Sequence, residues 1–547
     1  MSEDRNNSDA PAGSTDTRAN SNRYERVVDL LRQPGTYPEA PDAVNIIETH
    51  ISCVFLTDRF VYKLKKPVHY DFCDFSTLAA REHACREEVR LNRRLAHNVY
   101  LGVLPIIEDQ QHTLHLEGDL TRDRTVLVKD TVVDWVVKMR RLPTENTLDV
   151  LVRADRLSDA QISQLAAKLA EFYAVAVHVP VAAREYLSEI RRHVSANRQE
   201  LLSPDHTRDA TVVSRIHGAQ LQYLSLAEPL FDVRVGDGRI VEGHGDLRPE
   251  HICFEDKPAI FDCIEFNPEL RQVDVADELG FLAMECDRLG ASAVGRRIVD
   301  VYATRSGDRP PQALLSFYKS YRACVRGKVA ALRARQLAGA TQTAALDEAR
   351  EYLRLADGYV ADFSRPLVVV VGGLMGCGKS TLAAALAELF ACPRLATDAI
   401  RQELLGATKT PSNFDEGTYQ PENRERVYDD LLDRAEGFLA ERISVILDGT
   451  FLTAAWLDRA SQLAAKRNSE FLVVRCVCPD DVARKRIADR AATGGDPSEA
   501  RPELYDRQKA ELRPCPDQLP CVEVDTTVSL ETQVHAVIAK LRCAVGT

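Results

Sequence analysis

The stretch LVVVVGGLMGCGKSTLAAALAEL, at residues 367–389, constrains the fold of this chain more than any other. Five apolar residues, four of them valine, indicate a buried strand, and the apolar residues of the second half follow a helical spacing. The turn between them has the pattern G-x-x-x-x-G-K-[ST]. Its glycines let consecutive backbone N–H groups curl around a phosphate, at a helix N-terminus whose partial positive charge attracts the same group. The stretch therefore predicts a polyphosphate site in a parallel α/β domain.

The side chains of this turn predict how a nucleotide is held. Lys379 can reach the β- and γ-phosphates and assist their transfer, and the Ser380 hydroxyl suits Mg²⁺. Cys377 lies at the helix N-terminus, where the pKa of a thiol falls, so its oxidation could block nucleotide binding; a small residue that the loop merely tolerates is the simpler interpretation. The residues expected to bind the nucleotide are Gly373, Gly376, Cys377, Gly378, Lys379, Ser380 and Thr381.

Strand and helix patterns alternate after the loop, which favours a parallel sheet. Ligands of such sheets lie at the carboxyl ends of the strands, so we expect Asp398 and Asp448 to share a cleft with the loop. Asp398 begins a D-x-x-R pattern in which the carboxylate accepts a hydroxyl proton and Arg401 binds a substrate anion. Asp448 suits the hydration shell of Mg²⁺.

A helix with several arginines is expected before a Gly-Gly loop within residues 482–504, and this composition is typical of a lid over a transferring phosphoryl group. A solvated helix face explains each arginine singly about as well. The arginines are Arg484, Arg486 and Arg490, and we expect the last two to act in catalysis.

A second chemical group lies in IVEGHGDLRPEHICFEDKPAIFDCIEF, at residues 240–266. A strand leads into His244-Gly245-Asp246, and a hairpin returns through Asp262. Two carboxylates brought together in this way can divide the work of phosphoryl transfer. We expect Asp246 to accept the proton of an attacking hydroxyl and Asp262 to bind Mg²⁺.

These residues carry a resemblance to a known family. HGDLRPEH resembles the catalytic loop H-x-D-x-x-x-x-N of the aminoglycoside-phosphotransferase branch of the protein-kinase-like fold, and IFDCIEF resembles its metal-binding segment. The resemblance implies a two-lobed domain in which Lys63 pairs the α- and β-phosphates and Glu88 orients that lysine. It also implies that residues 134–143, with Met139, form the hinge that contacts adenine.

Two departures from the family pattern bear on catalysis. His251 stands where the family usually has Asn as a second Mg²⁺ ligand, and imidazole suits Mg²⁺ less well than an oxygen donor. In addition, no glycine-rich loop precedes Lys63, and residues 47–52 are expected in its place. A degenerate lobe that binds nucleotide, or only supports the fold, therefore stays open.

The second half of the chain resembles the small P-loop kinases, which include gluconate kinases, polynucleotide 5′-kinases and zeta-type toxins. The resemblance rests on the phosphate loop, the D-x-x-R pattern and the arginine-rich helix. Together the two resemblances imply a bacterial multidomain protein of α/β and α+β class. The expected domains are a disordered tail at 1–22, a kinase-like small lobe at 23–143, a large helical lobe at 144–362 and a P-loop kinase domain at 366–547.

Composition limits the partners and the location. The net charge of −12 argues against a nucleic acid held over a broad surface, and no apolar run reaches the length of a membrane span. The 14 cysteines show no C-x-x-C pair or zinc-type spacing, which favours reduced thiols in the cytoplasm.

The sequence thus predicts an ATP- and Mg²⁺-dependent kinase with two nucleotide-binding modules, acting on a hydroxyl of a sugar, amino sugar or aminocyclitol. An acidic face around Asp246, Glu265 and Glu269 would suit a cationic acceptor. Two alternatives stay open: one module is a nucleotide-sensing regulator, or the P-loop module is a nucleotide or nucleic-acid kinase. The sequence does not indicate an oligomeric state.

Overall fold

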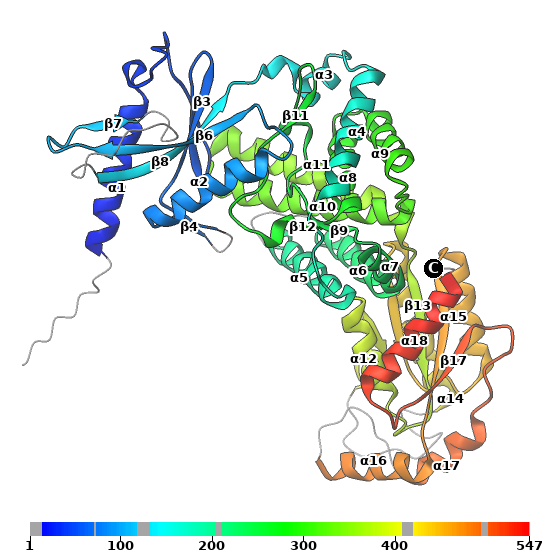
Figure 1. Ribbon diagram of the computed structural model, residues 1–547. Helices are drawn as coiled ribbons and strands as arrows, with labels where there is room; N and C mark the ends of the chain where they lie inside the picture. Colours follow the sequence, from blue (N-terminus) through cyan, green and yellow to red (C-terminus); the bar gives the residue numbers. More distant parts are fainter. Residues whose placement is uncertain are drawn as a thin grey trace, which may run out of the picture. The chain divides into compact units, whose positions relative to one another are not determined.

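A computed structural model describes residues 14–70, 73–117, 131–203, 209–406, 420–493 and 502–545 (Figure 1). The chain forms two compact units, each built from two separate segments. Unit 1 comprises Met1–Val179 with Gly238–Arg309, and unit 2 comprises Pro180–Asp237 with Pro310–Thr547. The region expected as the large helical lobe, 144–362, contributes to both units. No helix of the described residues is long and apolar enough to cross a bilayer.

Unit 1 begins with an antiparallel six-stranded sheet of order β1-β2-β3-β8-β6-β7. Its strands are β1 (Asn45–Glu48), β2 (Ser52–Leu56), β3 (Phe60–Lys65), β6 (Tyr100–Glu108), β7 (Leu114–Leu116) and β8 (Thr131–Arg140). Strands β2 and β3 form an antiparallel hairpin, which carries Lys63 on its second strand. Strand β6 escapes sequence patterns because Gly102 and Pro105 interrupt it, and a register shift between Tyr100 and Gly102 accommodates the irregularity.

Two helices cover the two faces of this sheet. Helix α1 (Ser14–Leu31) packs Val27 and Leu31 into the apolar cluster on one face, and α2 (Leu78–Asn92) packs Cys85 and Val89 into the cluster on the other. Helix α1 begins inside the segment expected as a tail at 1–22. Residues 14–22 lack the apolar spacing that is typical of a packed helix, so the sequence alone does not indicate this part of α1.

The rest of unit 1 is a helical core with short hairpins. Leu165, Leu169, Leu279 and Leu282 belong to one buried cluster that joins four helices to the hairpins. The elements are β4 (His69–Tyr70), β5 (Cys73–Asp74), α3 (Leu148–Arg153), α4 (Asp159–Val175), β9 (Ile240–Glu242), β10 (Ile252–Phe254), β11 (Pro258–Ile260), β12 (Gln272–Asp274), α8 (Val275–Arg288), α9 (Ser292–Ser306) and the 3-10 turns η1 (Pro34–Thr36), η2 (Thr144–Asn146), η3 (Pro249–His251) and η4 (Glu269–Arg271).

Unit 2 contains the predicted parallel α/β domain, with strand order β14-β15-β13-β16-β17. Its strands are β13 (Leu367–Gly372), β14 (Arg394–Ala396), β15 (Val445–Asp448), β16 (Glu470–Val477) and β17 (Cys521–Asp525). Its helices are α12 (Lys379–Leu389), α13 (Thr397–Leu405), α14 (Pro421–Ala440), α15 (Ala454–Lys466), α16 (Asp480–Thr493), α17 (Pro502–Glu511) and α18 (Leu530–Val545).

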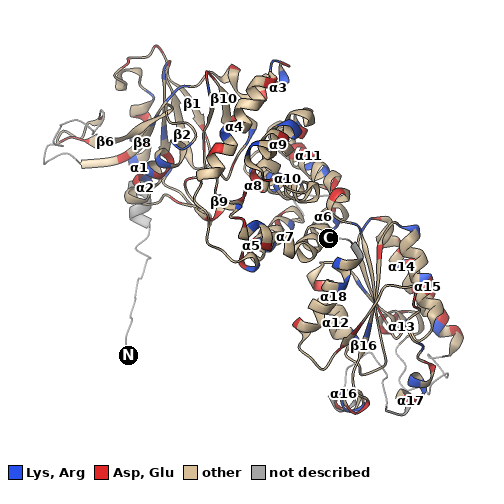
Figure 2. Cartoon of the chain, turned by 45° about the vertical axis from the view of Figure 1, so that its right-hand side comes forward, with Lys and Arg blue, Asp and Glu red and all other residues tan. Residues whose placement is uncertain are grey.

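Strand β13 is central because both of its faces are apolar. Val369 and Val371 pack with α12 and α18, whereas Val368 and Val370 pack with α14 and α15, which gives a three-layered domain (Figure 1). A strand that is buried on both sides reads as a continuous apolar run, as observed here. On α14 and α15 the basic and acidic residues are interspersed (Figure 2), and the pair Arg459–Asp429 joins the two helices at 2.7 Å.

Five further helices belong to unit 2 and pack partly against the parallel domain. They are α5 (Ala183–Leu201), α6 (Ala210–Leu226), α7 (Glu228–Gly236), α10 (Gln312–Ala334) and α11 (Gly339–Phe363). Leu226 at the end of α6 enters the apolar cluster of α12 and α18. Arg542 of α18 donates to the carbonyls of Ser225 and Leu226 at 2.9 and 3.0 Å and pairs with Glu228 at 2.7 Å. Helix α6 is therefore anchored to the sheet domain by apolar and polar contacts.

Replacing Arg542 by alanine is expected to lower the free energy of unfolding of unit 2 by about 1 to 3 kcal/mol, because two partly buried carbonyls and one carboxylate lose their donor. Urea-induced unfolding followed by circular dichroism measures the shift. The control is His535→Ala, since His535 is exposed on the same helix and its loss should change stability by less than about 0.5 kcal/mol. Equal effects of the two variants would contradict the anchoring role.

Candidate active sites

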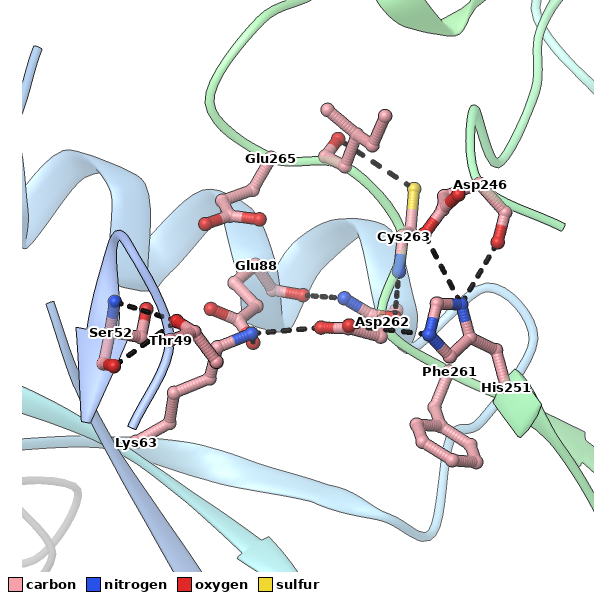
Figure 3. Close-up of polar contacts among 12 residues, drawn as sticks. Thr49, Ser52, Lys63, Glu88, Asp246, His251, Phe261, Asp262, Cys263 and Glu265 are labelled. Atoms are coloured by element: carbon pink, nitrogen blue, oxygen red, sulfur yellow. Dashed lines mark hydrogen bonds and ion pairs between the residues drawn. The ribbon is translucent and has the colours of Figure 1, made fainter. Parts of the chain in front are cut away.

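The first candidate site lies in unit 1 and joins three predicted residues. The ammonium group of Lys63, on β3, lies 2.9 Å from the Glu88 carboxylate on α2 and 2.8 Å from that of Asp262 (Figure 3). Strand, helix and hairpin thus meet at one lysine, as the kinase-like resemblance implies. Asp262 has a left-handed φ of 63°, and the Asp262 N–H donates to the Tyr100 hydroxyl at 3.1 Å. Such a backbone conformation persists only where neighbours hold it, and it is frequent at functional sites.

A second lysine extends this cluster into the interior. Lys65 lies two residues along β3 on the same face and is fully buried, paired with both Glu88 and Glu265. The cluster therefore alternates acid and base from Asp262 through Lys63, Glu88 and Lys65 to Glu265. Burial would lower the pKa of Lys63, but the carboxylates of Asp262 and Glu88 raise it well above its ordinary value. Burial would raise the pKa of Asp262, but Lys63 lowers it, so that both groups stay charged.

The loop that carries Asp246 is held from behind by a buried glutamate that sequence patterns did not single out. Glu278 of α8 accepts the backbone N–H of His244 at 2.8 Å, the N–H of Gly245, and the hydroxyl of Tyr173 at 2.9 Å. A Cβ at Gly245 would approach the Leu270 carbonyl to 2.9 Å, and φ there is 86°, so glycine is required. Glu278 lies between Asp277 and Glu285 in the stretch 275–286, and no spacing there distinguishes it from these two acids.

His251 contacts both predicted carboxylates. Its Nδ1 donates to the Asp246 carbonyl at 2.9 Å, because a carbonyl can only accept. Its Nε2 accepts from Arg248 at 3.1 Å and lies 3.6 Å from an Asp262 oxygen. Arg248 also lies 3.1 Å from the Asp246 carboxylate and 2.7 Å from Glu250. The imidazole thus links Asp246, Arg248 and Asp262, and its role as a metal ligand stays a prediction.

The six-stranded sheet contains Met139 and the turn expected in place of a glycine-rich loop. Met139 lies inside β8, opposite Val61 on one side and Tyr100 on the other, and the chain leaves the strand only after Arg140. Met139 is therefore part of the sheet rather than of the connection expected to contact adenine. The turn between β1 and β2 does occupy residues 49–52, where the Ser52 N–H donates to the Thr49 hydroxyl at 3.0 Å (Figure 3).

The second candidate site is the phosphate loop of unit 2. Gly373, Gly376 and Gly378 all have positive φ angles, and the first two leave no room for a side chain. A Cβ at Gly373 would lie 2.6 Å from the Cys476 carbonyl, and one at Gly376 would lie 2.5 Å from the Ala483 carbonyl. The loop is therefore closely packed between β16 and α16, which confirms the reason for glycine that the pattern implies.

The predicted ligands of Mg²⁺ and phosphate meet at the end of β13. The Ser380 hydroxyl donates to Asp448, at the end of β15, at 3.3 Å. Burial lowers the pKa of Lys379, but Cys377, Asp448 and Asp398 outweigh it and raise the pKa, so the lysine is charged. Burial raises the pKa of Asp448, whereas Lys379 lowers it. A positive charge thus stands beside two carboxylates at the edge where the parallel strands end.

The donor atoms of both sites suit Mg²⁺. Within the described residues no three His, Cys, Asp or Glu side chains form a metal-binding group. In phosphoryl-transfer sites Mg²⁺ is instead bound through one or two carboxylates and the phosphates themselves. Ser380 with Asp448 supplies two neighbouring oxygens, and the Asp262 side chain is 43% exposed. These residues would hold the ion.

The D-x-x-R pair lies at the same edge of the sheet. Asp398 and Arg401 form an ion pair across one turn of α13, with Asp398 more exposed than the arginine. Arg394, at the start of β14, donates to the Ser380 carbonyl at 3.0 Å and lies 3.7 Å from Asp448. The expected cleft therefore also contains Arg394, which sequence reasoning did not include.

Two of the three lid arginines lie beside the loop. Arg486 and Arg490 line a cavity of about 350 Å³ together with Gly378 and Thr381. Arg486 donates to the Thr526 hydroxyl and carbonyl at 3.0 and 2.8 Å, and that hydroxyl donates to the Cys377 carbonyl. The third, Arg484, pairs instead with Asp506 on α17. The Gly-Gly loop expected as a lid, within 494–501, lies outside the described residues.

Known proteins resemble this chain in part and as a whole. Residues 368–515 match the AAA-domain family AAA_33. The uncharacterized protein Rv2004c of Mycobacterium tuberculosis is 35% identical over 469 residues, which cover 83% of this chain and 87% of that protein. The chain belongs to the family of this protein. A cytidylate kinase of Methanopyrus kandleri is 31% identical over 156 residues, 28% of this chain and 75% of the kinase.

The first part of this family member also has a structural neighbour of the protein-kinase-like fold. The GDP complex of aminoglycoside 2′-phosphotransferase-IIIa shares 14% identity with a TM-score of 0.36, over 62% of this chain and 99% of that protein. The Lys63–Glu88–Asp262 arrangement has the form that the kinase-like resemblance implied. The AAA_33 match and the loop geometry confirm the P-loop resemblance of the second part. The second part of the protein thus contains a P-loop kinase domain that matches AAA_33.

Replacing Glu278 by glutamine is expected to lower the free energy of unfolding of unit 1 by about 1 to 3 kcal/mol, because the uncharged amide keeps one acceptor oxygen in place of two and places its NH₂ beside the buried N–H of His244. Denaturant-induced unfolding and amide hydrogen exchange of residues 244–246 measure the effect. Glu250→Gln is the control, since that carboxylate is more than a third exposed. Unchanged protection of the loop in Glu278→Gln would show that Glu278 does not hold it.

Proposed function

We propose that the protein is an ATP- and Mg²⁺-dependent kinase that phosphorylates a hydroxyl of a small molecule such as a sugar, amino sugar or aminocyclitol. The observation that carries this proposal is the convergence, at one edge of the parallel sheet, of Lys379, the Ser380–Asp448 pair and Asp398. A phosphate-binding loop, a Mg²⁺ site and a candidate base are then all within one cleft. We further propose a cytoplasmic location and a small-molecule acceptor as the partner.

Each residue of this cleft has a definite task in the proposed reaction. The loop N–H groups and Lys379 bind the phosphates and stabilise charge on the group being transferred. Asp398 accepts the proton of the acceptor hydroxyl, and its ion pair with Arg401 orients the carboxylate. Mg²⁺, when bound with the nucleotide, would neutralise phosphate charge beside Ser380 and Asp448. Arg486 and Arg490 line the cavity next to the loop, where the nucleoside would lie.

The charges around Asp398 bear on the acceptor. Arg394 and Arg401 both lie in the cleft, which favours an acceptor that carries an anionic group besides its hydroxyl. In unit 1 we expected Glu265 to belong to an acidic face with Asp246 and Glu269. Its side chain is instead buried and paired with Lys65. Asp246 also contacts Arg248. The negative charge near Asp246 that would attract a cationic acceptor is therefore smaller than the sequence indicated.

Lys379→Ala is expected to reduce ATP turnover by the P-loop module about 100-fold or more, because the phosphates lose their buried cation. Asp398→Asn should lower kcat by a similar factor while the KM for ATP changes little, since it removes only a proton acceptor. Initial rates are measured against sugars, amino sugars, aminoglycosides, nucleoside monophosphates and oligonucleotides.

The matched control for these variants is Arg459→Gln, an exposed arginine of α15 that pairs with Asp429. It should leave both constants unchanged. If the full chain consumes ATP equally with and without Lys379→Ala, the P-loop module is not responsible for ATP turnover. Turnover restricted to nucleoside monophosphates would replace the sugar acceptor by a nucleotide, the alternative that the cytidylate kinase similarity favours.

A second candidate function, nucleotide sensing by unit 1, is favoured by one specific contact. One oxygen of Asp262 is 2.8 Å from Lys63, and the other faces His251 at 3.6 Å. Both oxygens expected to bind Mg²⁺ thus contact groups of the chain itself, which would weaken catalysis there more than nucleotide binding. Under this interpretation unit 1 senses nucleotide while unit 2 catalyses.

His251→Asn tests that interpretation, because asparagine restores an oxygen ligand and removes the imidazole between Asp246 and Asp262. In a Lys379→Ala background, the variant should raise the residual ATP turnover at least severalfold, and a further Asp246→Asn change should abolish the gain. The measurement is phosphate release at saturating Mg²⁺. A residual rate that is independent of both residues would remove His251 as the reason for low activity.

A further inference from the structure

Two thiols meet behind the phosphate loop. Cys377 belongs to the loop and Cys476 to β16, 99 positions apart in the chain, and both side chains are 3% exposed in the same apolar cluster. The position that a Cβ would take at Gly373 lies 2.8 Å from the Cys377 sulfur and 3.4 Å from the Cys476 Cβ. Each thiol shifts the pKa of the other, so the two side chains are neighbours. The missing side chain of Gly373 leaves the space beside which both lie.

The two thiols of this pair are chemically unequal. The Cys476 thiol lowers the pKa of Cys377 against the opposing effect of burial, and Lys379 lowers it further. The same contact, together with burial, raises the pKa of Cys476. A thiolate beside a protonated thiol is the arrangement in which one sulfur is oxidised first and the other resolves it.

We propose that Cys377 and Cys476 form a redox-sensitive pair, and that their disulfide stops nucleotide binding at the phosphate loop. The oxidant is a peroxide. The Cys377 thiolate attacks one peroxide oxygen, the O–O bond breaks, and a sulfenic acid forms with release of water once the leaving hydroxide is protonated. The Cys476 sulfur then attacks the sulfenic sulfur, and a second water leaves with the Cys476 proton. Two thiols and one peroxide thus give one disulfide and two waters.

The disulfide would act on the loop through Cys377. A disulfide requires sulfurs about 2.05 Å apart, so the bond draws Cys377 and Cys476 toward each other, and we expect the loop to follow Cys377 toward β16. Its carbonyl accepts from Thr526, which also holds Arg486, and its neighbours Gly376 and Gly378 form the phosphate cradle. The shift therefore displaces the backbone N–H groups expected to bind phosphate. This consequence rests on the proposed nucleotide binding at the loop, whereas the linkage itself does not.

The chain supplies an internal control. Cys515 and Cys521 form a second pair of neighbouring thiols, and both are partly exposed, so the same oxidant reaches them more easily than the buried pair. They lie beside the apolar cluster on the other face of the sheet, away from the loop. Cys478, two residues after Cys476, is the rival partner for Cys377 because it is also partly exposed and electrostatically coupled to it.

The experiment measures ATP affinity of the full chain by titration calorimetry before and after two equivalents of hydrogen peroxide. All proteins in this experiment carry Lys63→Ala, which is expected to remove ATP binding by unit 1 from the measurement. We expect at least a tenfold loss of affinity that dithiothreitol reverses, and peptide mapping after thiol blocking should show Cys377 joined to Cys476. Cys476→Ser should keep its affinity within twofold under the same treatment. The double variant Cys515→Ser/Cys521→Ser should still lose affinity as the parent does.

The possible failures are distinguishable. A mapped Cys377–Cys476 disulfide with unchanged ATP affinity would overturn the regulatory consequence. Absence of that linkage, or a Cys377–Cys478 linkage in its place, would overturn the pair itself. Equal loss of affinity in Cys476→Ser would show that oxidation acts elsewhere. If the reduced protein binds no ATP, the proposed function and the regulatory consequence both fail, and peptide mapping still decides whether the pair forms.

Discussion

The phosphate loop of unit 2 leaves no space for side chains at two of its glycines, and the rest of this unit is arranged around that constraint. Gly373 lies against the Cys476 carbonyl and Gly376 against the Ala483 carbonyl, so the loop is closely packed between β16 and α16. Thr526 at the end of β17 then joins the loop to Arg486. The loop is thus held in one conformation by its contacts with β16, α16 and β17. We expect this conformation to direct its N–H groups toward a bound phosphate.

Unit 1 contains a buried cluster of several charged side chains. The acids and lysines alternate from Asp262 to Glu265, so each buried charge has an opposite neighbour. Buried ion pairs are weak sources of stability, yet removing one partner leaves an uncompensated charge and costs about 3 to 5 kcal/mol. The cluster is therefore better understood as a positioning device. It fixes Lys63 and Asp262 in one geometry, at the expense of a strained backbone at Asp262.

The sequence was sufficient where a local pattern encodes a local geometry. The phosphate loop, its flanking strand and helix, and the meeting of Lys63 with Glu88 and Asp262 all followed from short motifs. Contacts between distant segments did not follow. Glu278 behind the catalytic loop and Cys476 behind the phosphate loop belong to no local motif, and only the folded chain brings them to the site. The pairing of Met139 with two other strands is likewise encoded in no local pattern, and its contact with adenine stays a prediction.

The path of the chain limits how the two units can behave. The backbone passes from unit 1 to unit 2 after Val179, returns after Asp237 and leaves again after Arg309. No single cut therefore separates them. Helix α6, which contributes Leu226 to the apolar cluster of the parallel sheet, lies in the segment inserted between the two parts of unit 1. The inserted segment is held to the parallel domain of unit 2 by this apolar contact and by the Arg542 hydrogen bonds to the end of α6, so its stability depends on the parallel domain.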